Sequence, residues 1–382
     1  MTQAAIDILK TLVAFDTTSR HSNLALIAWV EAYLAARGIA SRRVLSADGA
    51  KANLIALVGP AVAGGVVLSG HTDVVPVDGQ DWRTDPFRVE SDGERLYGRG
   101  VADMKSFLAL ALAHMDQALA APIRKPLILA FSYDEEVGCL GAPDLIAALG
   151  DTPRPQAVIV GEPTNMKVVS GHKGISVFHV EVEGREAHSS QTDLGVSAIM
   201  EALKLMRLVE TMAEEARAGA DRTGLFDPPG ASITIGQVQG GTASNILARR
   251  CAFVWDLRCP PEVDPEIFVT RFMAYADQLD QDIKARAPEG GVKVTRRSNT
   301  PPLAPDWESG AETLARALTG DNGKTVASYA AEAGLFQGAG LPVVLCGPGD
   351  IAQAHQPNEW IALSQIEEGA RFMQRLIGRL SA

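Results

Sequence analysis

Short apolar segments alternate with longer amphipathic segments along most of the chain. Residues 65–70, 127–133, 157–161 and 341–346 are apolar, rich in β-branched side chains and bounded by glycine or by turn-forming residues. Such runs predict strands buried on both faces of a parallel sheet. A further strand is expected over 53–58, and apolar side chains recur at helical spacing over 4–15, 22–36, 104–121 and 142–149. This alternation of strands and helices predicts a doubly wound α/β domain.

The pattern changes after Gly171. Residues 175–183 alternate between polar and apolar positions, which is typical of a half-exposed antiparallel strand. The following segments predict the order β-α-β-β-α-β of a ferredoxin-like module, over 195–218, 231–239, 246–257, 265–283 and 291–297. The fold class is therefore α/β, with a mostly parallel-sheet domain and an inserted α+β domain. We expect the boundaries 1–171 and 300–382 for the first domain, and 172–299 for the insert.

Composition narrows the functional classes. The chain has 382 residues, 46% hydrophobic and 21% charged, with a net charge of −11. An acidic chain argues against a nucleic-acid partner, which favours a basic surface. No apolar run is long enough to span a bilayer, and the N-terminus lacks a basic secretory signal. The four cysteines form no CxxC pair, which favours reduced thiols in a cytoplasmic enzyme, at Cys139, Cys251, Cys259 and Cys346.

Several predicted strands lead directly into histidines or carboxylates. In open α/β sheets, ligands bind beyond the carboxyl ends of the strands. We therefore expect the polar side chains that follow these strands to gather at one edge of the sheet. The candidates are His71 with Asp73, the pair Glu135 and Glu136, Glu162, and His355, together with Asp103 ahead of the helix 104–121.

Each candidate also has a simpler interpretation. An isolated His-x-Asp occurs by chance, Asp103 could be a helix N-cap, and an acidic pair before a turn is usually a surface feature. Glu162 and His355 could each be a satisfied polar residue in a loop. Taken together, however, the five imidazole and carboxylate groups suit two zinc ions, or cobalt or manganese, at His71, Asp103, Glu136, Glu162 and His355.

The motifs around these residues resemble those of the M20 metallopeptidase and deacylase family. The resemblance is carried by residues 69–76, 97–105, 134–138 and 161–164, and it covers nearly the whole chain. It implies that Asp103 bridges two zinc ions and that Glu135 is the general base. It further implies that His71 and Glu162 hold one ion, that Glu136 and His355 hold the other, and that Asp73 orients His71.

The same resemblance implies roles for the inserted domain. In the family this domain is a lid that forms a homodimer, and a histidine matching His188 reaches the partner subunit's site to stabilise the oxyanion. Asn245 and Arg258 match family positions that contact substrate, and a guanidinium group can grip a carboxylate in bidentate fashion. From the residues alone, His188 is a loop histidine and Arg258 is equally well a surface charge at a strand end.

Two features bear on the substrate. Glu162 occupies a position where deacylase branches carry Glu and aminopeptidase branches carry Asp, so the resemblance implies deacylation of a small N-acyl amino acid. Residues 347–359 and 330–336 resemble enzymes acting on N2-acetyl-L-ornithine, although Ala330 and Ala331 depart from their usual sequence. In that case Glu332 would pair with the substrate ammonium. The alternatives are a related amidohydrolase, such as a succinyl-diaminopimelate desuccinylase, and a catalytically silent metal-binding protein.

Overall fold

A computed structural model describes residues 1–222 and 224–382, which divide into two compact units. The first unit comprises Met1–Gly171, Leu303–Val326 and Ala331–Ala382. The second comprises His172–Pro302 and also takes in Ala327–Ala330, a short segment that the sequence had placed with the first domain. Among the described residues there is no helix with both the length and the apolar character needed to span a bilayer.

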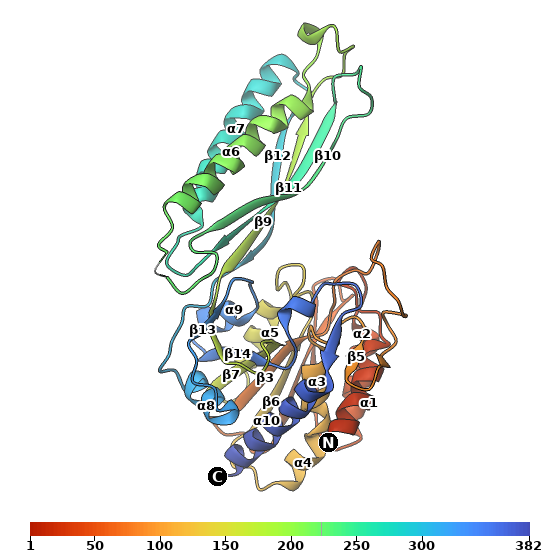
Figure 1. Cartoon of the computed structure of the whole chain (residues 1–382), viewed down its shortest axis with the longest axis vertical. Coiled ribbons are helices and arrows are strands. Elements are labelled where there is room, and N and C mark those ends of the chain that lie inside the picture. The colour runs from red at the N-terminus through yellow and green to blue at the C-terminus, as the bar shows by residue number, and fades with distance from the viewer. Residues whose placement is uncertain (223) are drawn as a thin grey trace. The chain divides into compact units, whose positions relative to one another are not determined.

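The first unit is built on an eight-stranded sheet in the order β1-β2-β6-β3-β7-β14-β8-β13. Figure 1 labels its central strands β3, β6, β7 and β14. Its central strands β6, β3, β7 and β14 are parallel, and antiparallel strands flank them, which confirms the expected mostly parallel sheet. The strands are β1 (Ser41–Leu45), β2 (Ala52–Val58), β3 (Val66–His71), β6 (Leu127–Ser132), β7 (Ala157–Pro163), β8 (Val169–His172), β13 (Thr325–Ala327) and β14 (Val343–Gly347).

A smaller antiparallel sheet in the same unit has the order β15-β5-β4, with β4 (Glu90–Ser91), β5 (Arg95–Tyr97) and β15 (Trp360–Ala362). The helices of this unit are α1 (Thr2–Val13), α2 (Leu24–Ala35), α3 (Lys105–Ala113), α4 (Met115–Ala120), α5 (Ala142–Leu149), α8 (Gly310–Thr319), α9 (Ala333–Gly338) and α10 (Leu363–Ser381), with a 3-10 turn η2 (Ile351–Gln353). The single helix expected over 104–121 is in fact two helices, because the first ends at His114.

Helix α3 lies close against the central strands. All nine of its residues are buried, and α1 and α10 pack against it. Gly161 in β7 permits this approach, because a Cβ at that position would lie 2.0 Å from Cγ of Phe107 in α3. Helix α5 contacts β2 and β6, and α9 contacts β14. This close packing fixes the loop ahead of α3, which contains Asp103, next to the ends of β3 and β7.

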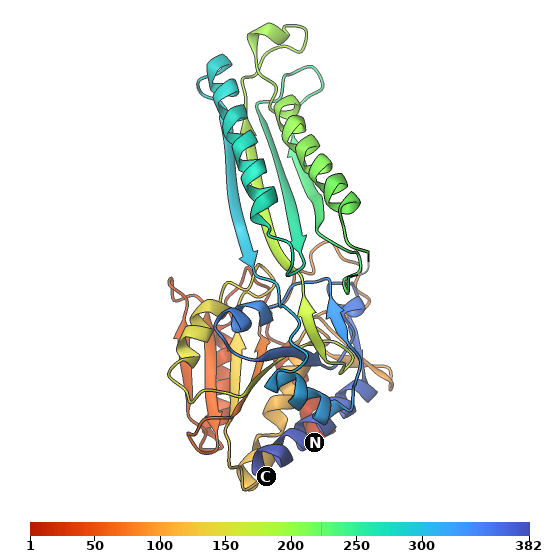
Figure 2. The same ribbon diagram turned by 90° about the vertical axis from the view of Figure 1, so that its left-hand side faces the viewer.

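The second unit is a four-stranded antiparallel sheet covered by two long helices (Figure 2). Its elements follow the predicted order, and the strand order β10-β11-β9-β12 is that of a ferredoxin-like fold. Its core includes Trp255, whose ring stacks on Phe178 with centroids 4.4 Å apart. The elements are β9 (Gly174–Glu183), a 3-10 turn η1 (Thr192–Leu194), α6 (Ala198–Ala218), β10 (Ser232–Gly240), β11 (Arg250–Cys259), α7 (Glu266–Arg286) and β12 (Gly291–Thr300).

Candidate metal centre

The carboxyl ends of the four central parallel strands bring polar side chains to one edge of the sheet, where the topology of α/β folds places ligands. His71 is the last residue of β3, and Glu162 lies near the end of β7. Glu135 and Glu136 follow β6, and His355 follows β14 after the turn η2. Asp103 is close to the N-terminus of α3. Five segments that are distant in sequence therefore contribute to one cluster.

Asp103 lies at the middle of this cluster. Its Oδ1 is 3.0 Å from Nε2 of His71, and its Oδ2 is 3.3 Å from Nε2 of His355. Nε2 of His355 also lies 3.0 Å from Oε2 of Glu136. Each oxygen of one carboxylate thus faces a different imidazole, which is the arrangement that a carboxylate bridging two cations needs.

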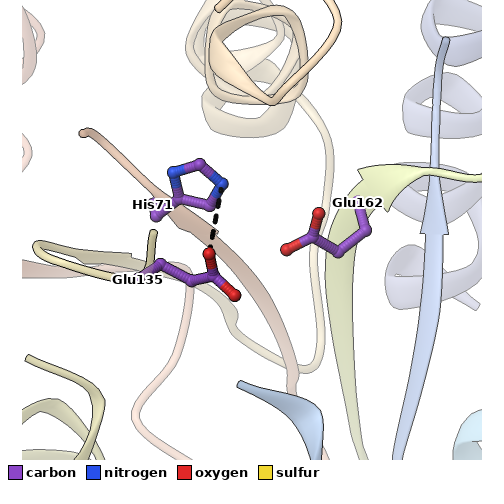
Figure 3. Close-up of side chains that lie close together, drawn as sticks. All are labelled: His71, Glu135 and Glu162. Carbon is purple, nitrogen blue, oxygen red and sulfur yellow. Dashed lines mark ion pairs between the residues drawn. The ribbon is translucent and has the colours of Figure 1, made fainter. Parts of the chain in front are cut away.

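The other side of the cluster contains His71, Glu135 and Glu162, which point toward one another (Figure 3). One potential ligand atom from each of the three lies within 4.8 Å of the others. Oε2 of Glu135 is 4.0 Å from Nε2 of His71. Glu162 is 4% exposed, and its Oε1 is buried without a hydrogen-bond partner among residues 1–222 and 224–382. A buried carboxylate oxygen of this kind needs a cation or a proton donor.

The cluster carries an excess of buried negative charge. Burial and the neighbouring carboxylate of Asp103 raise the pKa of Glu162 well above its usual value. Burial likewise raises the pKa of Glu136 and raises that of Glu135 well above its usual value. Burial by itself would lower the pKa of His71, but its hydrogen bond with Asp103 and the nearby acids outweigh burial and raise it.

These residues fit two divalent cations that share Asp103. The donor set is imidazole nitrogen and carboxylate oxygen, which suits zinc, cobalt or manganese. Divalent charge would compensate the buried carboxylates, and a cation next to Glu162 would satisfy its unpartnered oxygen. The side chain of His355 is 52% exposed, whereas that of His71 is 1% exposed, so the cluster is most open at His355.

Asp73 supports the cluster in two ways. Its main-chain carbonyl lies 2.9 Å from Nδ1 of His71, so a proton on Nδ1 leaves Nε2 free toward Asp103. Its carboxylate accepts hydrogen bonds from the main-chain N–H groups of Glu135 at 3.1 Å and Glu136 at 3.3 Å. The carbonyl of Asp73 therefore makes the short contact with His71, since the carboxylate oxygen is 3.7 Å away.

Two residues beside the acidic turn 134–136 were not anticipated from the sequence. The hydroxyl of Ser19 donates to the Asp73 carboxylate at 2.6 Å. The Lys51 ammonium group donates to the Asp134 carboxylate and to the main-chain carbonyl of Ser19. Both residues come from segments without a recognisable motif, and only the folded chain brings them beside the acidic turn.

Glu332 is a buried carboxylate that two hydroxyl groups contact. It is 1% exposed, and its carboxylate accepts hydrogen bonds from the hydroxyls of Ser69 at 2.5 Å and Ser132 at 2.8 Å. Burial raises the pKa of its carboxyl group. These two hydrogen bonds tie Glu332 to the ends of β3 and β6. Its carboxylate keeps further acceptor sites, so the contact with a substrate ammonium stays a prediction.

His188, Asn245 and Arg258 all belong to the second unit. Residues His188 and Ile246 form an isolated β-bridge, so His188 and Asn245 lie close together on exposed loops. Nδ1 of His188 accepts from the main-chain N–H of Ser190 at 3.2 Å, which places the proton of a neutral ring on Nε2. Arg258 is in β11, and its guanidinium lies 3.8 Å from Asp256.

A fold of this kind with such a cluster is typical of a metallohydrolase, and comparison with known proteins identifies the family. The model of peptidase family M20/M25/M40 matches residues 67–379, so the chain belongs to this family. The chain is therefore a metallohydrolase that acts on amide bonds.

Two curated relatives indicate the part of the family that this chain resembles. It is 36% identical to the acetylornithine deacetylase of Myxococcus xanthus, over 97% of this chain and 95% of the relative. It is 29% identical to the acetylornithine deacetylase of Pasteurella multocida (strain Pm70), over 97% of this chain and 94% of the relative.

Solved structures share the fold at lower identity. Human carnosine dipeptidase 1 superposes with a TM-score of 0.77 at 18% identity, covering 100% of this chain and 97% of that one. An M20 family metallo-carboxypeptidase from Sulfolobus solfataricus gives a TM-score of 0.77 at 16% identity, covering 99% of each chain. These two similarities confirm the expected fold class.

Proposed function

We propose that this protein is a zinc-dependent deacetylase that converts N2-acetyl-L-ornithine and water to L-ornithine and acetate, in cytoplasmic arginine biosynthesis. The observation that supports it most is the arrangement around Asp103, whose two oxygens face His71 and His355. The relative from Myxococcus xanthus, at 36% identity, supports the choice of substrate.

The metal ligands in this proposal are the five clustered groups. His71 and Glu162 would hold one zinc ion, Glu136 and His355 would hold the other, and Asp103 would be shared between them, with cobalt or manganese able to substitute. When bound, two such ions lower the pKa of a water molecule and polarise the acyl carbonyl.

Glu135 is the proton carrier of the reaction. Its carboxylate points into the cluster beside His71 and Glu162 (Figure 3). Its main-chain N–H donates a hydrogen bond to the carboxylate of Asp73. It takes a proton from the water that attacks the acetyl carbonyl and delivers it to the departing α-amine. Glu136, the next residue, is hydrogen-bonded to His355 instead, so the two adjacent acids have different tasks.

The second unit completes the site in the proposal. Nε2–H of His188 of the partner subunit donates a hydrogen bond to the oxyanion of the tetrahedral intermediate, consistent with the acceptor role of Nδ1. Asn245 and Arg258 hold the α-carboxylate of the substrate, for which the planar guanidinium is suited. This arrangement requires a homodimer formed through the inserted domain.

The surface of the second unit supports such a dimer. Helix α6 exposes Ile199 (39%), Met200 (60%) and Leu203 (50%) at its N-terminal end, an unusual group of apolar side chains for a solvent-facing surface. Strand β10 has a neighbour on one side only within the described residues, so its other edge is open to pairing. A second copy would cover both features.

The test compares kcat/KM of zinc- or cobalt-loaded protein on N2-acetyl-L-ornithine and on N-succinyl-diaminopimelate. A strong preference for acetylornithine is expected. A preference for the succinyl compound would refute the substrate assignment and leave a related desuccinylase, and absence of any amide turnover with both ions bound would favour a silent metal-binding protein.

A further inference from the structure

One buried ion pair joins the loops that carry two of the candidate metal ligands. Arg99 and Glu359 are each 1% exposed, and Nη1 of Arg99 lies 2.8 Å from Oε2 of Glu359. Arg99 lies four residues before Asp103, and Glu359 lies four residues after His355. Neither side chain is part of the cluster itself, and the chemistry proposed above does not use them.

The carboxylate of Glu359 is enclosed by the loop that ends at Asp103. Its Oε2 accepts from the main-chain N–H of Gly100 at 3.1 Å. Its Oε1 accepts from the main-chain N–H groups of Ala102 at 2.8 Å and of Asp103 itself at 3.1 Å. The carbonyl of Glu359 also accepts from the N–H of Gly98 at 3.0 Å. The position of Asp103 therefore depends directly on this carboxylate.

The same pair holds the loop that carries His355. Gln80 donates from Nε2 to the main-chain carbonyl of His355 at 2.8 Å, and its Oε1 accepts from Arg99. Nη1 of Arg99 also lies 3.4 Å from the carbonyl of Gln356. Because the imidazole of His355 is 52% exposed, its position depends more on its main chain than on packed neighbours.

We propose that Glu359, with Arg99, is a positioning residue for the metal centre, which sets the spacing between Asp103 and His355 and thereby the affinity for the ion that His355 and Glu136 hold. This inference rests on the proposed metal function. Groups that orient metal ligands typically change metal affinity by about 10–100-fold when they are replaced.

The variant Glu359→Gln keeps the size of the side chain and exchanges one oxygen for an NH2 group. That NH2 group would face main-chain N–H donors on either side of the carboxylate, and Arg99 would lose its counter-ion. The matched control is Glu312→Gln, another fully buried carboxylate paired with an arginine. Glu312 bonds Ser170 and Arg316, which lie outside the loops of Asp103 and His355.

The experiment titrates metal-free protein with cobalt or zinc in competition with a chelating dye, and records thermal unfolding of each metal-free variant. Wild type should bind two ions per chain. Glu359→Gln should lose about tenfold or more in affinity for the ion that His355 and Glu136 hold, and should lose less affinity for the other ion, which keeps His71 and Glu162. Glu312→Gln should keep both affinities, even if its unfolding temperature falls.

Two ions bound by Glu359→Gln with wild-type affinities would overturn the inference, and so would an equal loss in Glu312→Gln. If Glu359→Gln fails to fold, Gln80→Ala replaces it, and the same ion should bind several-fold more weakly than in wild type. Unchanged affinity in Gln80→Ala would then overturn the inference. If wild type itself binds no pair of ions, the proposed metal function fails. If wild type binds two ions and Glu359→Gln binds them equally well, only the inference about Glu359 fails, so the two claims are tested separately.

Discussion

The carboxylate of Asp73 provides a sharp test of how the acidic turn is positioned. Asp73→Asn keeps the main-chain carbonyl that contacts His71, so the metal ligand should stay in place. The change affects only the acceptors for the N–H groups of Glu135 and Glu136 and for the hydroxyl of Ser19. An asparagine has one acceptor oxygen, so at least one of the two N–H groups loses its partner.

The magnitude follows from the contacts that are lost. A hydrogen bond to a charged group contributes about 1.5–3 kcal/mol, and one such bond is lost while the other becomes neutral. If that energy positions Glu135, kcat should fall by about 10–100-fold, since about 1.4 kcal/mol corresponds to tenfold. KM and the metal content should stay close to those of wild type, because Asp73 touches the turn rather than the substrate.

Asp134→Asn is the matched control, because Asp134 lies on the same turn but is bound to Lys51. Steady-state kinetics and metal analysis of the two variants are compared with wild type, and Asp134→Asn should keep kcat within about threefold of wild type, because its carboxylate bonds Lys51 and not the main chain of Glu135 or Glu136. The reasoning is refuted if Asp73→Asn keeps wild-type kcat, or if it loses activity only in proportion to lost metal. Equal losses in both variants would also contradict it, because they would indicate a general loosening of the turn.

Two further predictions concern the second unit. His188→Ala should lose activity without losing metal. An equal mixture with Glu135→Gln should recover about a quarter of the wild-type rate, because half of the dimers are hybrids and each hybrid has one intact site. No recovery under demonstrated subunit exchange would exclude a shared site. Burial lowers the pKa of His172 to about 4, so the folded chain keeps this ring neutral while the unfolded chain takes up a proton below about pH 6.5. Stability is therefore lost as the pH falls through this range. Between pH 7 and pH 5 this should lower the free energy of unfolding by about 2 kcal/mol. In urea unfolding at both pH values, His172→Leu should show a correspondingly smaller loss. An equal loss in both proteins would contradict the role of His172 in this pH dependence.

The sequence predicted those parts of the fold that depend on local pattern. Buried strands such as β3 and β7 are continuous apolar runs, and the ligands His71 and Glu162 lie at their carboxyl ends. The order of strands and helices in the second unit was also predicted, because hydrophobic residues recur with different periods in its strands and in its helices. Helix α10 was not predicted, although Ile366, Met373 and Ile377 follow a helical pattern that could have revealed it.

The remaining features depend on contacts between distant segments. β1 was not predicted, because its side chains are partly exposed and include Arg42 and Arg43. The motif around Glu332 did not show that Ser69 and Ser132 donate hydrogen bonds to its carboxylate. Positioning groups of this kind carry no local signal, since their partners are identified only after the chain has folded.

The central claim is that Glu135 moves the proton at a metal centre formed by its neighbours. The most direct test measures bound metal and kcat together for Glu135→Gln, with Glu136→Gln as the control that removes a metal ligand. Glu135→Gln should retain two ions per chain and lose about 10²–10⁴-fold in kcat, as expected for loss of a general base, whereas Glu136→Gln should lose an ion. Near-normal turnover by Glu135→Gln with both ions bound would contradict the account.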